Sequence, residues 1–101
     1  MIKKVTPETA LKRAARDFMR LYQVWTFPLT AGMGSHPGAP DRLGIYEGKP
    51  LAIEFKRPKG VLNAFQEQFK KDWESRGGIH ITCRSIEDLA DALGIKTLGI
   101  L

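Results

Sequence analysis

The pattern of apolar and polar positions changes period several times along the chain and predicts alternating helices and strands. A first helix is expected from about Pro7 to Tyr22, with Thr6 as its N-cap and proline at the first helical position, where its missing N–H costs nothing. Its apolar face is expected to hold residues three and four apart, namely Ala10, Leu11, Ala14, Ala15, Phe18, Met19 and Tyr22. The basic residues are assigned to the opposite, solvated face: Lys12, Arg13, Arg16 and Arg20.

Three short strands are predicted next, at Val24–Leu29, Arg42–Glu47 and Pro50–Lys56. The segment Thr30–Pro40 between the first two is broken by glycine and proline, which predicts a loop. The turn residues Glu47-Gly48-Lys49-Pro50 predict that the second and third strands form a hairpin.

A second helix is expected from about Leu62 or Asn63 to Arg76, ended by Gly77-Gly78. Its inner side is expected to hold Leu62, Phe65, Phe69 and Trp73, and both tryptophans, Trp25 and Trp73, are assigned to the core. Gln66 lies among these apolar positions, where a polar side chain needs a partner.

The chain is expected to end with a strand at Ile79–Cys83 and a helix that runs to Leu93 and closes at Gly94, with Ser85 and Asp88 as a capping box. The order α-β-β-β-α-β-α predicts an α/β fold, a mixed sheet flanked by helices. The tail Ile95–Leu101 is apolar enough for an edge strand or a subunit contact.

Composition narrows the class of protein. A chain of 101 residues is expected to form one domain, and its net charge of +5 favours a polyanionic partner, nucleic acid first and an anionic membrane surface second. The lone Cys83 excludes an intramolecular disulfide and is expected to be a core residue. No long apolar run or signal peptide is present, so we expect an intracellular, cytoplasmic protein without a membrane span.

The strand Pro50–Lys56 carries the chemistry. Because side chains alternate along a strand, Leu51, Ile53 and Phe55 are expected on one face, and Glu54 and Lys56 together on the other. A carboxylate and an ammonium in an otherwise apolar strand are costly unless they pair or bind something. The plain alternative is an exposed pair on a one-sided sheet.

Asp41 precedes the second strand, so the hairpin is expected to bring it beside Glu54. Alone, Asp41 after a proline is an ordinary turn residue. Two carboxylates held that close repel each other, and a divalent cation resolves the repulsion. Oxygen ligands of this kind suit Mg²⁺ or Mn²⁺, with the backbone carbonyl of Phe55 as a further ligand.

The ordered set Gly38-Ala39-Pro40-Asp41, Ile53-Glu54-Phe55-Lys56 and Gln66 resembles the PD-(D/E)XK nuclease superfamily, and within it the virus-type replication-repair nuclease (VRR-NUC) domain. The segment Arg57-Pro58-Lys59-Gly60 matches the Pro/Gly stretch of that pattern. The resemblance covers roughly Glu8 to Leu93 and implies a restriction-endonuclease-like αβββαβα core.

By that resemblance the protein is a Mg²⁺- or Mn²⁺-dependent DNA endonuclease, a homodimer acting on branched DNA such as four-way junctions. Asp41 and Glu54 then bind the metal, Lys56 is catalytic, and Glu8 and Gln66 complete the site. Basic residues flanking the site are the expected DNA contacts, namely Arg57, Lys59, Lys70 and Lys71.

Other interpretations stay open at the level of sequence. Glu8 near a helix N-terminus favours the macrodipole whatever its function, and Gln66 has the alternative of bonding only backbone. A histidine in a loop, such as His36, is usually neither catalyst nor ligand, and His80 is expected to be structural. For the whole chain, the alternatives are a catalytically silent nucleic-acid-binding module and a structural subunit of a replication or repair assembly.

Overall fold

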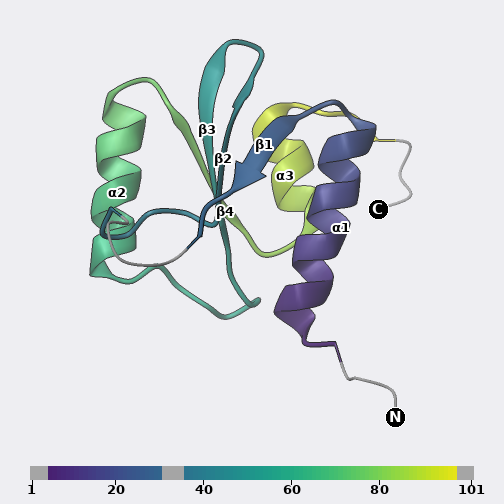
Figure 1. Ribbon diagram of the computed structural model, residues 1–101, viewed down its shortest axis with the longest axis horizontal. Helices are drawn as coiled ribbons and strands as arrows, with labels where there is room; N and C mark the ends of the chain where they lie inside the picture. Colours follow the sequence, from purple (N-terminus) through teal and green to yellow (C-terminus); the bar gives the residue numbers. More distant parts are fainter. Residues whose placement is uncertain (1–4, 31–35, 98–101) are drawn as a thin grey trace.

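The computed structural model describes residues 5–30 and 36–97, and this part of the chain forms a four-stranded sheet with helices on both faces (Figure 1). The elements are α1 (Pro7–Leu21), β1 (Trp25–Pro28), β2 (Arg42–Tyr46), β3 (Lys49–Phe55), α2 (Ala64–Ser75), β4 (Ile79–Cys83) and α3 (Ile86–Leu93). The predicted order and α/β class are confirmed. None of these helices is long and apolar enough to cross a bilayer.

The sheet is mixed, with strand order β1-β2-β3-β4. β1, β2 and β3 pair in antiparallel fashion, and β4 runs parallel to β3. The β2–β3 hairpin has a two-residue loop, Glu47-Gly48, in which both residues have positive φ as a tight hairpin requires. The turn is therefore shorter than the four residues predicted, and Lys49 and Pro50 belong to β3.

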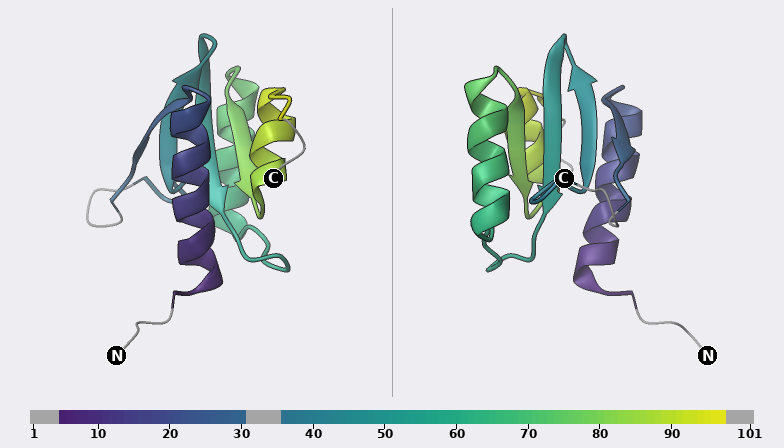
Figure 2. Two further views of the ribbon diagram at one scale, coloured as in Figure 1. Left: turned by 90° about the vertical axis from the view of Figure 1, so that its right-hand side faces the viewer. Right: turned by 60° about the vertical axis from the view of Figure 1, so that its left-hand side comes forward.

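The core lies between the sheet and the helices α1 and α3, which cover the same face (Figure 2). The strand β3 presents Leu51, Ile53 and Phe55 to this core, as the alternation predicts. From the helices come Ala15, Phe18, Met19, Leu89, Ala90 and Leu93. In α1 the buried stripe is narrower than expected, since Ala10 and Ala14 are exposed.

The opposite face is covered by α2, which contributes no buried residue. Phe69 and Trp73 stack on each other and are half-buried over β4. Phe65, expected on the inner side, is 66% exposed, so that prediction is wrong. The reason is that the first turn of α2 packs against the loop backbone at Gly38 rather than over a strand.

Two further expectations are wrong at the ends of the sheet. Trp25, assigned to the core, is 62% exposed, because β1 is an edge strand whose covered face carries Thr26 instead. Residues 95–97 form no strand; Ile95 packs against the core, and residues 98–101 of the predicted tail lie outside the described part of the chain. Cys83 is fully buried in β4, as predicted.

Candidate active site

Two carboxylates meet where β2 begins and β3 ends. The hairpin pairs Arg42 with Ile53, so the preceding residue, Asp41, lies beside Glu54. The Phe55 N–H donates a hydrogen bond of 2.8 Å to Asp41 Oδ2, which ties the Asp41 side chain to the end of β3. The predicted approach of the two acidic residues is confirmed.

Glu54 is a buried carboxyl, only 6% exposed. Its pKa is raised from the ordinary value of 4.5 to about 7, first by burial and then by the charge of the neighbouring Asp41 and a hydrogen bond with it. The charges of Lys56 and Lys12 offset part of this rise. Because Glu54 takes up a proton near neutral pH, the nearby positive charges do not fully balance its negative form.

Gln66 connects the carboxylate pair to α2. Its Nε2–H donates to Glu54 Oε1 at 3.0 Å, and its Oε1 accepts from the Asn63 N–H at 2.9 Å. Asn63 is the N-cap of α2 and accepts in turn from the Gln66 N–H. This reciprocal capping box fixes the Gln66 side chain. Gln66 therefore bonds both the helix backbone, through its amide oxygen, and the Glu54 carboxylate, through its amide nitrogen.

The loop before β2 approaches α2 closely because Gly38 has no side chain. A Cβ at this position would collide with the Phe65 carbonyl, and Gly38 has a φ of +74°. Pro40 is buried, and the Asp41 carbonyl accepts a hydrogen bond of 2.8 Å from the Leu29 N–H. The G-x-P-D segment thus places Asp41 between the end of β1 and the first turn of α2.

Lys12 is a site residue that the sequence prediction missed. Its Nζ lies 3.3 Å from Glu8 and 3.9 Å from Asp41, so it links α1 to the carboxylate pair and does not belong to a purely solvated stripe. The signal was present in the sequence. The resemblance places Glu8 in the site, and Lys12, four residues later, lies on the same side of a helix.

Glu8 contacts Lys12 but does not join the carboxylate pair. Within residues 5–30 and 36–97, no group of three or more His, Cys, Asp or Glu side chains could hold a metal ion by itself. A cation here would have Asp41 and Glu54 as its side-chain ligands. This donor set fits Mg²⁺ or Mn²⁺, which bind few protein oxygens and retain waters. An ion would offset both the burial of the Glu54 charge and its repulsion by Asp41, which together raise the pKa of Glu54.

The predicted basic residues lie on different elements around this carboxylate pair. Lys56 directly follows β3, is half-buried, and its charge acts on Glu54. Arg57 and Lys59 are exposed in the segment after β3, which Arg84 anchors through two hydrogen bonds to the Gly60 carbonyl. On α2, Lys70 is half-buried and Lys71 is exposed; the charge of Lys70 adds to burial in lowering the pKa of His80.

A cavity of about 570 Å³ opens beside Asp41 and Gln66, between α2 and the loop before β2. His36 lies on its rim, with its ring in edge contact with that of Phe69 at 5.7 Å. His80 is buried in β4, and within the described residues its Nδ1 has no hydrogen-bond partner. Burial lowers the pKa of His80, which favours its neutral form and agrees with a structural role.

Comparison with known proteins gives one match, at the level of structure. No protein-family model matches the sequence, and no curated protein does. A solved structure described as a VRR_NUC domain superimposes with a TM-score of 0.74, covering 92% of this chain and 100% of that chain, at 19% sequence identity. The chain has the fold of a VRR_NUC domain.

The resemblance inferred from the motifs is thus confirmed for the fold. Within this fold the three motif residues form a chain of contacts from β2 to α2. Asp41 contacts Glu54, and Glu54 accepts a hydrogen bond from Gln66. At this level of identity the match carries the arrangement of helices and strands, and the chemistry of the site is argued from the side chains of this chain.

Proposed function

We propose that this protein is a Mg²⁺- or Mn²⁺-dependent endonuclease that hydrolyses phosphodiester bonds in DNA. The observation that carries the proposal is the buried Glu54 carboxyl held against Asp41, with Lys56 on the next outward position of the same strand end. The structural neighbour described as a VRR_NUC domain supports the same class of activity.

Hydrolysis adds the oxygen of a water to phosphorus and releases one ester oxygen. The attacking water must lose a proton and the leaving oxygen must take one up, and negative charge grows on the phosphate and the leaving oxygen during the reaction. A divalent cation supplies acidification of the water and neutralisation of the phosphate charge. We assign Asp41, Glu54 and the Phe55 carbonyl to holding that cation.

The remaining residues act on charge and position. Lys56, whose charge already acts on Glu54, orients the water or stabilises charge on the phosphate. Gln66 holds the Glu54 carboxylate in place through its 3.0 Å hydrogen bond. Arg57, Lys59, Lys70 and Lys71 are proposed phosphate contacts around the site.

Branched DNA as the substrate and a homodimer as the active form are part of the proposal and rest on the resemblance. The dimer has one further support. Trp25 and Ile45 are cross-strand neighbours and, with Phe27, form an exposed apolar patch on the uncovered face of β1 and β2. Light scattering is expected to give twice the chain mass at micromolar concentration, and a monomer would remove this part.

The activity is tested by incubating linear, flap and four-way-junction DNA with the protein, with and without Mn²⁺. Cleavage is expected only with the metal and to fall at least about 10³-fold in Asp41→Asn and Glu54→Gln, because loss of either ligand removes the charge that holds the ion. Asp91→Asn and Glu87→Gln, exposed carboxyl residues on α3, are matched controls that should cut normally.

Undiminished cutting by Asp41→Asn or Glu54→Gln would reject the assignment. Salt-sensitive DNA binding without any metal-dependent product would instead favour the catalytically silent binding module.

A further inference from the structure

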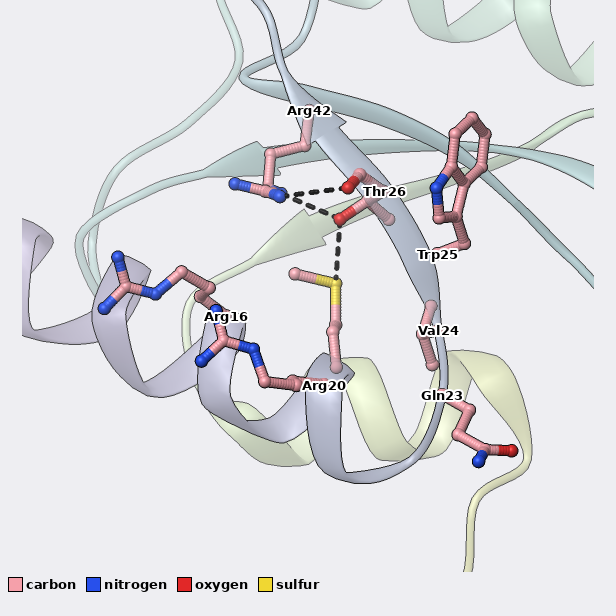
Figure 3. Close-up of a pocket in the computed structure, with 8 residues that line it drawn as sticks. Arg16, Arg20, Gln23, Val24, Trp25, Thr26 and Arg42 are labelled. Atoms are coloured by element: carbon pink, nitrogen blue, oxygen red, sulfur yellow. Dashed lines mark hydrogen bonds between the residues drawn. The ribbon is translucent and has the colours of Figure 1, made fainter.

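A second pocket, of about 450 Å³, lies on the α1 side of the sheet (Figure 3). It shares no lining residue with the cavity beside Gln66. Three arginines line it: Arg16 and Arg20 from α1, and Arg42 from the start of β2. The other lining residues are uncharged, namely Met19, Gln23, Val24, Trp25 and Thr26. The pocket therefore gathers positive charge without a lining carboxylate.

Arg42 is held in place on the wall of this pocket. Its Nε–H donates to Thr26 Oγ1 at 2.8 Å and its Nη2 donates to the Thr26 carbonyl at 3.2 Å (Figure 3). The Thr26 hydroxyl in turn lies 3.5 Å from Met19 Sδ. Since a guanidinium carries five N–H donors, several remain for a ligand in a plane that the protein has already fixed.

The charge of this pocket is not balanced within the protein. Burial lowers the pKa of Arg42, and the charge of Arg16 lowers it further. Arg16 approaches Asp17 at 3.9 Å, but both side chains are more than half exposed, so this pair contributes little. Among the described residues, Arg20 forms no ion pair. An anion is the ligand that this arrangement favours.

The pocket is adjacent to the proposed active site along two paths. Arg42 directly follows Asp41 in the chain. Along α1, Lys12, Arg16 and Arg20 follow one another at intervals of four residues, and Lys12 contacts Asp41. At a rise of 1.5 Å per residue, Arg16 and Arg20 lie roughly 6 and 12 Å further along the helix, the axial rise of about two to four nucleotides at 3.4 Å each.

We propose that this arginine pocket binds backbone phosphates of the DNA strand about two to four nucleotides from the phosphate at Asp41 and Glu54. The proposal rests on the proposed nuclease function, which defines that reference phosphate. A planar guanidinium binds phosphate oxygens in bidentate fashion, which matches the fixed Arg42. Trp25 contributes to the lining, but its ring points away from the three arginines, on the other side of β1 (Figure 3). The groups that face a ligand are therefore guanidinium N–H donors, which suit phosphate oxygens.

The first test measures binding of a fluorescent four-way junction in EDTA over a range of salt concentrations. Arg16→Gln/Arg20→Gln is expected to weaken binding about 10- to 50-fold at 0.1 M salt and to reduce the slope of log affinity against log salt by nearly 2, about 0.9 for each lost phosphate contact. Arg13→Gln/Lys96→Gln removes the same charge from exposed positions outside the pocket and is the matched control. Equal slopes for the two double variants would overturn the proposal.

The second test locates the phosphates. A single neutral methylphosphonate, placed two to four nucleotides from the cut, should weaken DNA binding by the wild type. The same substitution should cause no further loss of affinity in Arg16→Gln/Arg20→Gln, which already lacks the contact. If the methylphosphonate weakened binding equally in the wild type and in Arg16→Gln/Arg20→Gln, the phosphate site in this pocket would be rejected. Metal-dependent cutting by the wild type would still support the nuclease function. A reduced salt slope in a protein that yields no product would keep the phosphate site and reject the nuclease.

Discussion

The two faces of the sheet differ in what they bury. The face covered by α1 and α3 holds a continuous apolar cluster in which Leu51, Ile53 and Leu89 are completely inaccessible to solvent. The face covered by α2 holds the buried polar residues Glu54 and His80, and α2 itself contributes no buried side chain. One strand, β3, serves both faces because its side chains alternate.

The face covered by α1 and α3 therefore supplies most of the stability, and the face covered by α2 carries the groups that could do chemistry. The apolar face can be packed without regard to substrate, whereas the α2 face keeps groups that are costly to bury. In the described part of the chain, Trp73 Nε1 and His80 Nδ1 are buried without hydrogen-bond partners on that second face. A small protein tolerates these costs because the first face supplies the core.

The largest effect on stability is expected from the apolar face. Leu89→Ala removes a fully buried side chain and should lower the free energy of unfolding by about 2–5 kcal/mol, because it leaves a cavity in the core. Phe65→Ala on α2, at a 66% exposed position, should change it by no more than about 0.5 kcal/mol. Urea denaturation measures both; comparable losses would contradict the division between the faces.

The next largest effect is the pH dependence of stability that the buried Glu54 carboxyl should cause. Because the pKa of Glu54 in the folded protein is about 7, above its ordinary 4.5, the fold prefers the protonated form. Stability without metal should therefore fall as pH rises from about 4.5 to 7, on the order of 3 kcal/mol, and Glu54→Gln should lose this dependence.

Thermal melts in EDTA at several pH values test this expectation. His80, with its lowered pKa, contributes a trend of opposite sign at acidic pH, and the difference between wild type and Glu54→Gln removes that contribution. Parallel profiles for the two proteins would show that Glu54 titrates normally.

The smallest effect separates the cap from the site. Gln66→Ala removes both the capping bond to Asn63 and the hydrogen bond to Glu54, whereas Asn63→Ala disrupts only the cap. Each should destabilise by about 1 kcal/mol. Only Gln66→Ala should also slow cleavage, by roughly tenfold, since it alone releases the Glu54 carboxylate. Equal cleavage rates for the two variants would assign Gln66 to the cap alone.

The sequence predicted those parts of the site that depend on local pattern. The alternation in β3 separated Glu54 from Ile53 and Phe55, and the hairpin turn predicted the approach of Asp41. Both depend on strand geometry and a short loop, which the order of residues determines directly.

The rest depends on how the layers meet. Lys12 was assigned with the other basic residues to the face of the first helix opposite the apolar one, and only the position of Asp41 before β2 brings that carboxylate within reach of Lys12. Trp25 and Phe65 were assigned to the core by their hydrophobicity, but no described element covers them. The sequence predicted Arg42 only as the first residue of a strand, and its position against Thr26 and α1 follows from the packing of that strand beside the helix.

The central claim is that Asp41 and Glu54 jointly bind one divalent cation. Titration of Mn²⁺ followed by electron paramagnetic resonance at pH 8, above the pKa of Glu54, tests it without any substrate. The wild type and Asp91→Asn should bind Mn²⁺ with equal affinity, and Asp41→Asn and Glu54→Gln should each bind at least about tenfold more weakly. Unchanged Mn²⁺ affinity in Glu54→Gln would contradict the account.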